Sequence, residues 1–450
     1  RQGLGHKETI YGLDFSDCGR YLASASVDST VRIWEVSTNK LLSTLTGHKT
    51  DFECLRVAWA SSAWNKKLLN RGKVSGNDPY KFLVASGGAD GTVKIWKSSD
   101  ASKKNGFECI YTLNHSHFQR RSSEGNDEEV SQVYGLEFID NWQGVGMKDA
   151  QANCFLMTCS DDFVHLWEVE VGGTKPFQLV EVMSFRFSSY DNVNYGVTVE
   201  RVTSSGLDLS SISETKSEPK TEAKAETRSE PRKASEAEPE TTQTAGAFGG
   251  DRNPENLIYV FDASYCETNG LLGTALADGT VRLVNGRGIC VSILSLPGCQ
   301  SHLTSFAWDA AGTRLASCVA TGHLVMWELD YGDHRGFVMP SCAAVLEGGH
   351  DWGRPLYGAK FCGGSQEELV ASWGVDGKVC LWDSRLKGNV RIPVSTLVFK
   401  PDYPIYAVSI GQRTESDKLS TIAVGGGREA GFLGIPIFLY DVAKATAEGN

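Results

Sequence analysis

Apolar and polar residues alternate through a short unit that recurs along the chain. In residues 21–34 (YLASASVDSTVRIW) the alternation predicts two strands, because successive side chains of a strand point to opposite faces. Val31 and Ile33 share one face of the second strand. Asp28 lies between the strands, where its carboxylate can accept hydrogen bonds from backbone N–H groups of a tight turn. The unit is therefore a predicted β-hairpin.

The same hairpin returns at intervals along the whole chain. Further copies end at Trp96, Val284 and Trp382, and degraded copies end at Trp167, Trp327 and Tyr440. An alternating strand precedes each hairpin and another strand follows most of them, and Gly-His pairs open three of these units. A unit of four strands repeated in this way is typical of a repeat architecture. The chain holds seven such units in its 450 residues.

Gly-His, four strands and a third strand that ends in Trp together resemble the WD-repeat β-propeller family. The resemblance covers nearly the whole chain outside one insert, and it implies an all-β, seven-bladed propeller of four-stranded antiparallel blades. WD-repeat propellers usually take the outer strand of the last blade from the N-terminus. Only residues 1–4 precede the first Gly-His here, so we expect a closing strand that is very short or partly missing.

A charged insert at 204–250 interrupts the pattern. Its core (ETKSEPKTEAKAETRSEPRKASEAEPE) alternates acidic and basic residues, and its glutamates recur four apart, which opposes a helix. Prolines interrupt it further. We predict a disordered segment that divides one propeller domain into residues 1–203, with blades one to three and the start of the insert, and residues 251–450, with blades four to seven. The preceding stretch, 190–202, is expected to add an edge strand or to pack on the face that carries the Gly-His loops.

Composition narrows the functional classes. Hydrophobic residues at 41% and 11 Trp suffice for a large core, and the formal net charge of −11 argues against general nucleic-acid binding. The 12 Cys lack the paired spacing of zinc sites or disulfide scaffolds. Cys154 and Cys159 with His165 suggest a metal, but all three fit strand positions or their approach. We expect reduced cysteines, no metal, no cofactor, no membrane anchorage, and a cytoplasmic or nuclear protein whose partners are other proteins.

His, Ser and Asp recur together, which invites the interpretation of a hydrolase triad. The sets are His6, Ser24, Asp28 and Trp34; His48, Ser86, Asp90 and Trp96; and His350, Ser372, Asp376 and Trp382. Recurrence argues against catalysis, because an enzyme needs one such site. The alternative is a buried hydrogen-bond network, since buried polar groups must be paired. The WD-repeat resemblance implies the same network as an Asp-His-Ser-Trp tetrad. We therefore predict a non-catalytic protein, with a hydrolase as a remote alternative.

A rigid propeller positions its loops, and loops on a rigid scaffold usually carry binding. We expect a protein-interaction scaffold that binds its partners through the loops on the Gly-His face. An aromatic side chain close to Arg is a typical hot-spot composition. The candidate contacts are Asp51, Phe52, Arg120, Trp352 and Arg354. Trp352 has a second interpretation, as a core residue at a blade edge.

The Trp-Asp-x-Arg stretch at Trp382, Asp383 and Arg385 supports a second hypothesis. It resembles the motif by which some WD-repeat proteins dock on the adaptor of cullin-RING ubiquitin ligases. The resemblance implies that Arg385 is the key contact, with Asp376 and Asp383 in support, and that the chain is a substrate receptor. Only one copy is present, and Trp-Asp also simply ends a WD blade.

Overall fold

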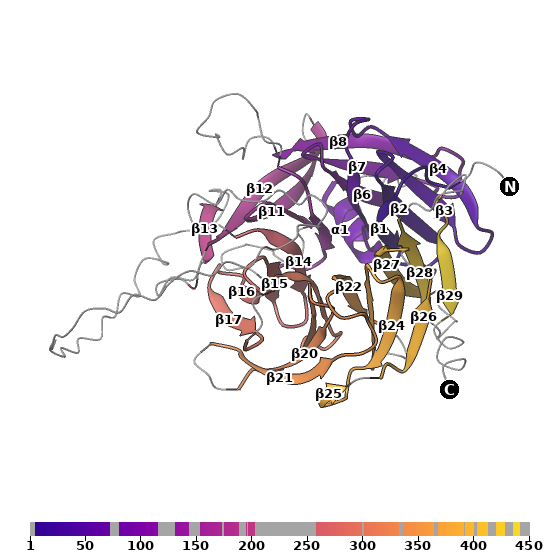
Figure 1. Ribbon diagram of the computed structural model, residues 1–450. Coiled ribbons are helices and arrows are strands. Elements are labelled where there is room, and N and C mark those ends of the chain that lie inside the picture. Colours follow the sequence, from indigo (N-terminus) through magenta and orange to yellow (C-terminus); the bar gives the residue numbers. More distant parts are fainter. Residues whose placement is uncertain are drawn as a thin grey trace, which may run out of the picture.

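Seven β-sheets stand around one axis in the computed structural model, and each sheet is one blade of a propeller (Figure 1). The structure describes residues 5–72, 81–115, 131–143, 154–172, 175–188, 195, 197–202, 258–298, 301–332, 336–363, 368–390, 392–399, 403–412, 420–427 and 435–441. The predicted seven-bladed, all-β fold is confirmed. The prediction of disorder for 204–250 lies outside the described residues.

Apart from β25, the strands follow one another blade by blade along the chain. Blade one consists of β1 (Ile10–Phe15), β2 (Tyr21–Ser26), β3 (Thr30–Glu35) and β4 (Lys40–Thr46). Blade two consists of β5 (Cys54–Trp59), β6 (Phe82–Gly88), β7 (Thr92–Ser98) and β8 (Glu108–Asn114). Blade three consists of β9 (Gly135–Ile139), β10 (Phe155–Ser160), β11 (Phe163–Gly172), β12 (Lys175–Phe187) and β13 (Val197–Val202). Blade four consists of β14 (Val260–Cys266), β15 (Leu271–Leu276), β16 (Thr280–Asn285) and β17 (Cys290–Ser295). Blade five consists of β18 (Leu303–Trp308), β19 (Arg314–Val319), β20 (Leu324–Asp330), β21 (Met339–Leu346) and β25 (Gly388–Val390). Blade six consists of β22 (Leu356–Phe361), β23 (Leu369–Gly374), β24 (Lys378–Asp383) and β26 (Ser395–Val398). Blade seven consists of β27 (Ile405–Gln412), β28 (Ser420–Gly426) and β29 (Phe438–Asp441).

The core lies between adjacent blades. Every residue of β2, β10 and β15 is buried, because the neighbouring blades cover both faces of each sheet. The hydrophobic cluster between blades one and two, for example, joins Tyr21 to Val57, Trp59 and Trp96. Burial on both faces explains why small side chains fill these strands and why even the serines on them need hydrogen-bond partners.

Each blade has two ends. The Gly-His loops lie at the same end as the turns between the second and third strands, and we call this end the top face. After Asp28, Asp90, Asp278 and Asp376, the turns place Ser29, Gly91, Gly279 and Gly377 at φ values of 63°, 70°, 80° and 73°. This left-handed conformation favours glycine, which occupies three of the four positions.

Blade seven packs directly against blade one and closes the ring. Ile10 and Phe15 of β1 share a hydrophobic cluster with Ala407 of β27 and Ala423 of β28. The backbone N–H of Ile435, shortly before β29, donates to the carbonyl oxygen of His6 at 2.6 Å and forms one antiparallel bridge. Contact between the N-terminal part and the last blade thus exists at His6, while residues 1–4 of the expected closing strand lie outside the described residues.

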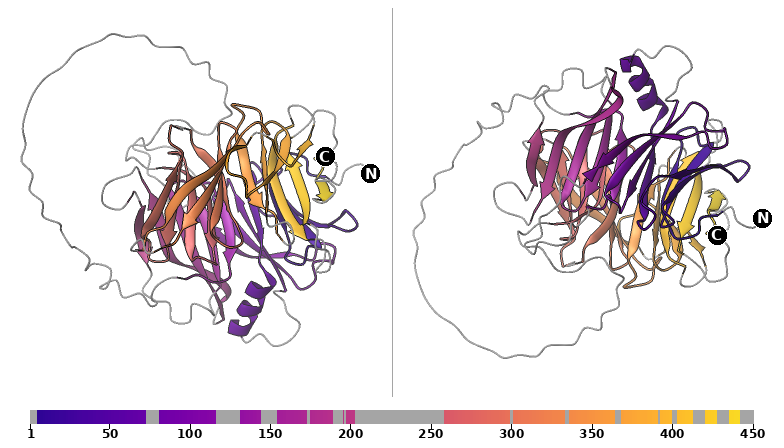
Figure 2. Two further views of the ribbon diagram at one scale, coloured as in Figure 1. Left: turned by 90° about the horizontal axis from the view of Figure 1, so that it is seen from below. Right: turned by 90° about the horizontal axis from the view of Figure 1, so that it is seen from above.

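Three elements extend the basic blades. The insert after β5 forms helix α1 (Ser62–Gly72), which projects from the face opposite the top (Figure 2). The predicted edge strand at 190–202 is present as β13, which pairs with β12. β25 leaves blade six and pairs in parallel with β21 of blade five.

Candidate functional site on the top face

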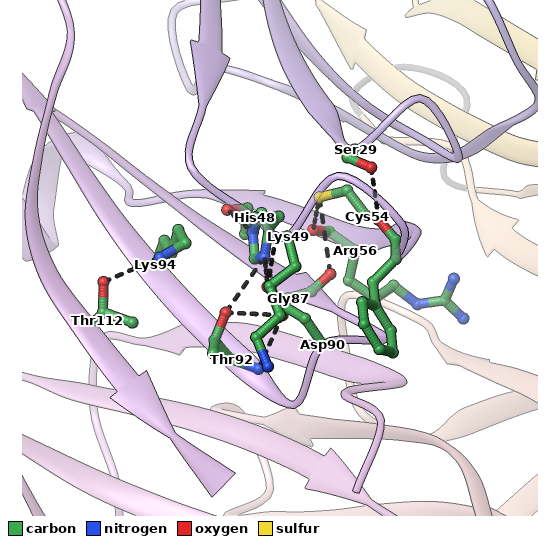
Figure 3. Close-up of polar contacts among 12 residues, drawn as sticks. Ser29, His48, Lys49, Cys54, Arg56, Gly87, Asp90, Thr92, Lys94 and Thr112 are labelled. Atoms are coloured by element: carbon green, nitrogen blue, oxygen red, sulfur yellow. Dashed lines mark hydrogen bonds and ion pairs between the residues drawn. The ribbon is translucent and has the colours of Figure 1, made fainter. Parts of the chain in front are cut away.

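The recurring His, Ser, Asp and Trp side chains meet in blade two, and Figure 3 shows His48 beside Asp90 and Thr92. The Nδ1 atom of His48 lies 3.1 and 3.2 Å from the two carboxylate oxygens of Asp90, and its Nε2 atom lies 2.8 Å from Ser86 Oγ. The indole N–H of Trp96 donates to the same hydroxyl at 2.9 Å. A neutral imidazole satisfies this chain, with Nδ1–H donating to Asp90 and Nε2 accepting from Ser86.

The carboxylate of Asp90 also organises the backbone around it. It accepts hydrogen bonds from the backbone N–H of Lys49 at 3.0 Å and from the backbone and hydroxyl of Thr92 at 3.0 and 2.7 Å. Burial acts to raise the pKa of this carboxyl, but the hydrogen bonds from His48, Lys49 and Thr92 outweigh it and hold the pKa well below its usual range. Asp90 therefore joins the Gly-His loop to the turn between β6 and β7.

Blades one and six repeat this geometry. The distance from His Nδ1 to the nearer Asp oxygen is 2.9 Å for His6 and 3.0 Å for His350. The hydroxyls of Ser24 and Ser372 lie 2.7 and 2.8 Å from the histidine Nε2 atoms, and both serines are fully buried. Buried hydroxyls that are already paired with His and Trp cannot reach a substrate, which supports the structural interpretation over a hydrolase.

Blades three and five contain altered forms of the network. In blade three, Thr158 takes the place of Ser and accepts from Trp167 Nε1 at 2.9 Å, with His115 Nε2 at 3.3 Å. In blade five, Trp327 Nε1 donates to Ser317 Oγ at 2.9 Å. His165, considered above as a metal ligand, contacts the carboxylate of Glu181 at 2.7 Å instead. Among the described residues, no group of His, Cys, Asp and Glu side chains is arranged to hold a metal ion.

Two of the predicted contact loops lie on the top face and are held by the preceding blade. Ser29 Oγ donates to the carbonyl oxygens of Thr50 and Phe52 at 3.0 and 2.7 Å, which fixes the loop that carries Asp51 and Phe52. The Asp51 side chain is exposed and Phe52 is half-buried, with the Lys49 ammonium 5.6 Å from its ring centre. Arg120, the third predicted contact, lies outside the described residues.

The corresponding loop of blade six presents Trp352 to solvent. This side chain is 78% exposed, so Trp352 is not a core residue of the blade edge. Its ring meets His323 edge-on at 4.7 Å. The backbone N–H of Gly353 donates to Thr321 O at 3.0 Å, which ties the loop to blade five. Arg354 is exposed beside it.

Arg385 lies at the opposite end of the blade from the top face. Its side chain is 59% exposed, and its guanidinium pairs with Asp383 at 2.7 Å and with Glu368 at 2.6 Å. These two carboxylates raise the pKa of Arg385, with Asp383 as the larger contributor. Trp382 itself is buried and donates to Ser372, and Asp376 belongs to the tetrad on the top face. Of the two supporting carboxylates that the resemblance implies, Asp383 therefore pairs with Arg385, whereas Asp376 lies at the opposite end of the blade.

Five of the seven blades carry an aromatic residue at the start of the first strand, and we call these five residues the aromatic collar. The first strands share a β-bulge whose extra residue is aromatic in four blades, and Tyr134 occupies the matching place in blade three. The collar consists of Tyr11, Tyr134, Phe261, Tyr357 and Tyr406. Its signal in the sequence was an aliphatic residue, Tyr and then Gly or Ala, repeated in IYG, VYG, LYG and IYA.

Charged side chains lie beneath the collar on the same strands. Asp14 accepts from the backbone N–H of Trp59 of the next blade at 2.8 Å. Glu137 does the same with Tyr265 at 3.0 Å, so each carboxylate ties two blades together. Burial raises the pKa of Asp14, and it raises the pKa of Glu137 to about 7.

Comparison with known proteins agrees with the architecture. The family described as WD domain, G-beta repeat matches residues 2–35 and 71–97. The family model thus matches parts of the first two blades, and the chain contains WD repeats within a seven-bladed propeller. The propeller of this family is the architecture of a protein-interaction scaffold.

Similar proteins cover only parts of the chain. Nuclear distribution protein PAC1-1 of Uncinocarpus reesii is 32% identical over 103 residues, which is 21% of this chain and 23% of that protein. Probable cytosolic iron-sulfur protein assembly protein 1 of Candida glabrata is 26% identical over 171 residues, or 37% of this chain and 40% of that protein. Mitochondrial division protein 1 of Eremothecium gossypii is 20% identical over 194 residues, or 42% and 20%. The chain thus matches less than half the length of each relative. No helix in the described ranges is long and apolar enough to cross a membrane.

Proposed function

We propose that this propeller is a non-catalytic scaffold that binds a partner protein through its top-face loops, with Trp352 as a central contact. The observation that carries the proposal is the 78% exposure of this indole on a fixed loop. Trp is among the residues most enriched in binding hot spots, and an isolated exposed Trp buries a large apolar area when a partner covers it.

The loop is built to hold this side chain in place. Asp376 of the tetrad accepts the backbone N–H of Asp351 at 3.0 Å, one residue before Trp352. The carboxylate of Asp351 pairs with Lys378 Nζ at 2.7 Å, and Gly353 is tied to Thr321. A contact residue on such a preorganised loop loses little conformational entropy on binding, which favours affinity. The tetrad of blade six thus has a positioning role for the proposed contact.

The proposal is tested by affinity purification with quantitative mass spectrometry from cells that express the intact chain or a variant. Trp352→Ala is compared with Ile392→Ala, because the Ile392 side chain is equally exposed, at 80%, but lies beside the outer strand of blade six. We expect recovery of the main partner to fall at least tenfold with Trp352→Ala and to stay within twofold with Ile392→Ala, since loss of a hot spot typically costs about 2 kcal/mol. Equal recovery with both variants would remove Trp352 from the interface.

The receptor hypothesis has one observation in its favour. Arg385 is exposed at the end of β24, where an adaptor could reach it. However, Asp383 and Glu368 already neutralise this guanidinium, so an adaptor must replace those contacts. Adaptor binding therefore remains a second proposal, with its own test below.

A further inference from the structure

The outer strand of blade six, β26, has one open edge (Figure 1). It pairs with β24 on one side, and in the part of the chain that the structure describes no strand pairs with its other side. The backbone N–H of Phe399 donates to the carbonyl oxygen of Gly377 at 2.8 Å, which fixes the alternation of this antiparallel ladder. By that alternation, the backbone N–H and C=O groups of Thr396 and Val398 point away from β24. These groups form the row that an added strand would bind.

An apolar side chain stands on this open edge. Val398 lies directly opposite Lys378, the first residue of β24, and its side chain is 68% exposed. The residues in the matching place of blades one, two and four also lie opposite the first residue of the third strand, and all are polar: Thr46, Asn114 and Ser295. Polar or charged residues on an exposed edge hinder pairing with another chain. At this position blade six lacks that protection.

Two other blades already carry a fifth strand at the outer edge. β13 pairs with β12 of blade three in the antiparallel direction, and β25 pairs with β21 of blade five in the parallel direction. The outer edge of a blade in this protein therefore accepts an added strand in either direction. Among the described residues, β26 has the same kind of edge without the fifth strand.

The open row has a defined lower end. The N–H of Val394, just before β26, donates to the carbonyl oxygen of Leu381 at 2.7 Å and thus points toward β24. Ile392 precedes this point, so its exposed side chain lies outside the row formed by Thr396 and Val398. Ile392 therefore provides a control for the exposure of an apolar residue without the paired edge.

The chemistry of the edge selects an extended segment as its ligand. A row of backbone N–H and C=O groups is satisfied by the backbone of another strand, whereas the backbone groups of a helix are already paired within the helix. The methyl groups of Val398 favour an apolar side chain beside them. Since successive side chains of a strand point to opposite faces, the ligand would carry apolar residues at alternate positions.

The edge is continuous with the proposed contact on the top face. The Lys378 ammonium, opposite Val398, pairs with the Asp351 carboxylate at 2.7 Å, and Asp351 directly precedes Trp352. One ion pair thus separates the loop of Trp352 from the upper end of β26. A partner that covers this indole is therefore close to the open edge.

We propose that an extended segment of the top-face partner, apolar at alternate positions, adds to β26 as a fifth strand of blade six. This inference rests on the proposed function, because it assigns a second contact to the same partner. It goes beyond that function by naming the conformation and the side-chain pattern of the segment that binds.

The test measures hydrogen exchange of single backbone amides in the full chain, with and without a millimolar strand peptide. The probe is acetyl-Lys-Val-Thr-Val-Thr-Val-Lys-amide. Its control has the same side chains but carries methyl groups on two adjacent central backbone nitrogens, so neither edge of the peptide can pair. We expect exchange at Thr396 and Val398 to slow about fivefold or more with the probe, because only the bound state protects these amides. The matching amides of Thr44 and Thr46 on β4 should change less than about twofold, since their edge is polar.

Three results would overturn the proposal. These are unchanged exchange at Thr396 and Val398, equal slowing on β4, and equal slowing by the methylated peptide. Measurement at two chain concentrations without peptide tests another occupant. Protection that increases with chain concentration would assign the edge to a second copy of this chain and contradict the partner strand.

Variants locate the binding. Val398→Lys should abolish the slowing at Thr396, whereas Ile392→Lys places the same charge on an equally exposed side chain and should preserve it. Val398→Thr keeps the shape and the backbone N–H and should weaken the effect, which provides a second variant if Val398→Lys does not fold. Equal slowing in all three variants would contradict the assignment to β26. Trp352→Ala should leave the peptide effect unchanged, so a failure of the Trp352 contact is distinguishable from a failure of the strand.

Discussion

Blades two and four hold their top ends together by different chemistry. In blade two, the carboxylate of Asp90 in the turn accepts hydrogen bonds from His48 and from the backbone N–H of Lys49. In blade four, Asp278 occupies the same place in the turn, but it pairs with Arg282 Nη2 at 2.7 Å. Thr274 and Val284 stand where blade two has Ser86 and Trp96, so blade four lacks the tetrad.

In blade four, the Arg282 side chain connects the turn to another segment of the chain. Its Nη1 atom donates to the carbonyl oxygens of Ser188 and Tyr195, which precede blade four, at 2.8 and 2.9 Å. As in blade two, the turn is thereby connected to a segment that follows a strand of the preceding blade, here the segment between β12 and β13. Since one fold uses two chemically unrelated solutions for one connection, the common feature is satisfaction of buried polar groups and not a reaction. This comparison supports the structural interpretation of the recurring His, Ser and Asp.

The largest effect is expected in blade two. Asp90→Ala leaves His48, the Lys49 N–H and Thr92 without their shared acceptor and should lower the free energy of unfolding by roughly 3 kcal/mol, because unsatisfied buried groups cost about 1–3 kcal/mol each and relax in part. His48→Ala should cost roughly 1–3 kcal/mol. Urea titration measures both values, with Asp51→Ala as the exposed control. A loss as small as that of the control would reopen a catalytic interpretation.

Blade four should respond somewhat less. Arg282→Met keeps the length of the buried side chain but removes its hydrogen bonds, leaving two carbonyl oxygens and Asp278 without it. We expect a loss of roughly 2 kcal/mol in the same titration. The partial exposure of Asp278, at 27% of its side chain, lets water compensate for that group. A loss well above that of Asp90→Ala would contradict the view that the two connections are equivalent.

Stability should depend on pH in opposite directions for the tetrad aspartates and for Glu137 on β9. The pKa values of Asp28, Asp90 and Asp376 are lowered in the folded chain, so their contribution is present above the ordinary carboxyl pKa and is lost as the pH falls below it. Glu137 acts in the opposite direction. Its folded pKa of about 7 makes the folded state bind the proton more tightly, so stability falls as the pH rises from about 4.5 to 7.

Glu137→Gln isolates the contribution of Glu137 to the pH dependence of stability. The variant should flatten the decline between pH 5 and pH 7, which we expect to amount to roughly 1–2 kcal/mol, because the neutral amide cannot titrate. Melting temperatures across this pH range provide the measurement. An unaltered decline in the variant would assign the effect to another group.

Exposed residues should have the smallest effect on stability. Trp352→Ala should change the free energy of unfolding by less than about 0.5 kcal/mol. Substitutions in the buried tetrads should have a larger effect. A loss near 2 kcal/mol by urea titration would show that Trp352 serves the fold and would weaken its proposed role in binding.

Arg385→Ala should also leave stability within about 0.5 kcal/mol of the unmutated chain, since its ion pairs are exposed. Its effect on pull-down of the ligase adaptor distinguishes the second proposal. Loss of adaptor with this variant would support the receptor hypothesis, and failure of the unmutated chain to recover any adaptor would refute it.

Most of the fold could be predicted because its signals are local. The period-two alternation, the Asp turn and the Trp that ends the third strand recur within each hairpin, and these mark the blades without knowledge of their neighbours. Helix α1 could not be recognised in this way. It is held by contacts distant in sequence, where Trp64 packs on Phe138 at 4.8 Å and donates to Phe155 O at 3.1 Å.

The candidate site was only partly predictable. Trp352 and Arg354 were singled out because an aromatic residue and Arg stood in a Gly-His loop, but the exposure that makes Trp352 a candidate depends on how blade five supports that loop. β25 joins two blades through pairing that no local pattern marks. The collar had a visible repeat, yet its meaning arises only when seven first strands converge on one axis.

The central claim, that the recurring His and Asp form structural pairs, is tested most directly by a double-mutant cycle. The free energy of unfolding is measured for the unmutated chain, His48→Ala, Asp90→Ala and the double variant. We predict a coupling energy of at least about 1 kcal/mol, because each single change leaves the other buried partner unsatisfied. Additive losses, with coupling near zero, would contradict the account.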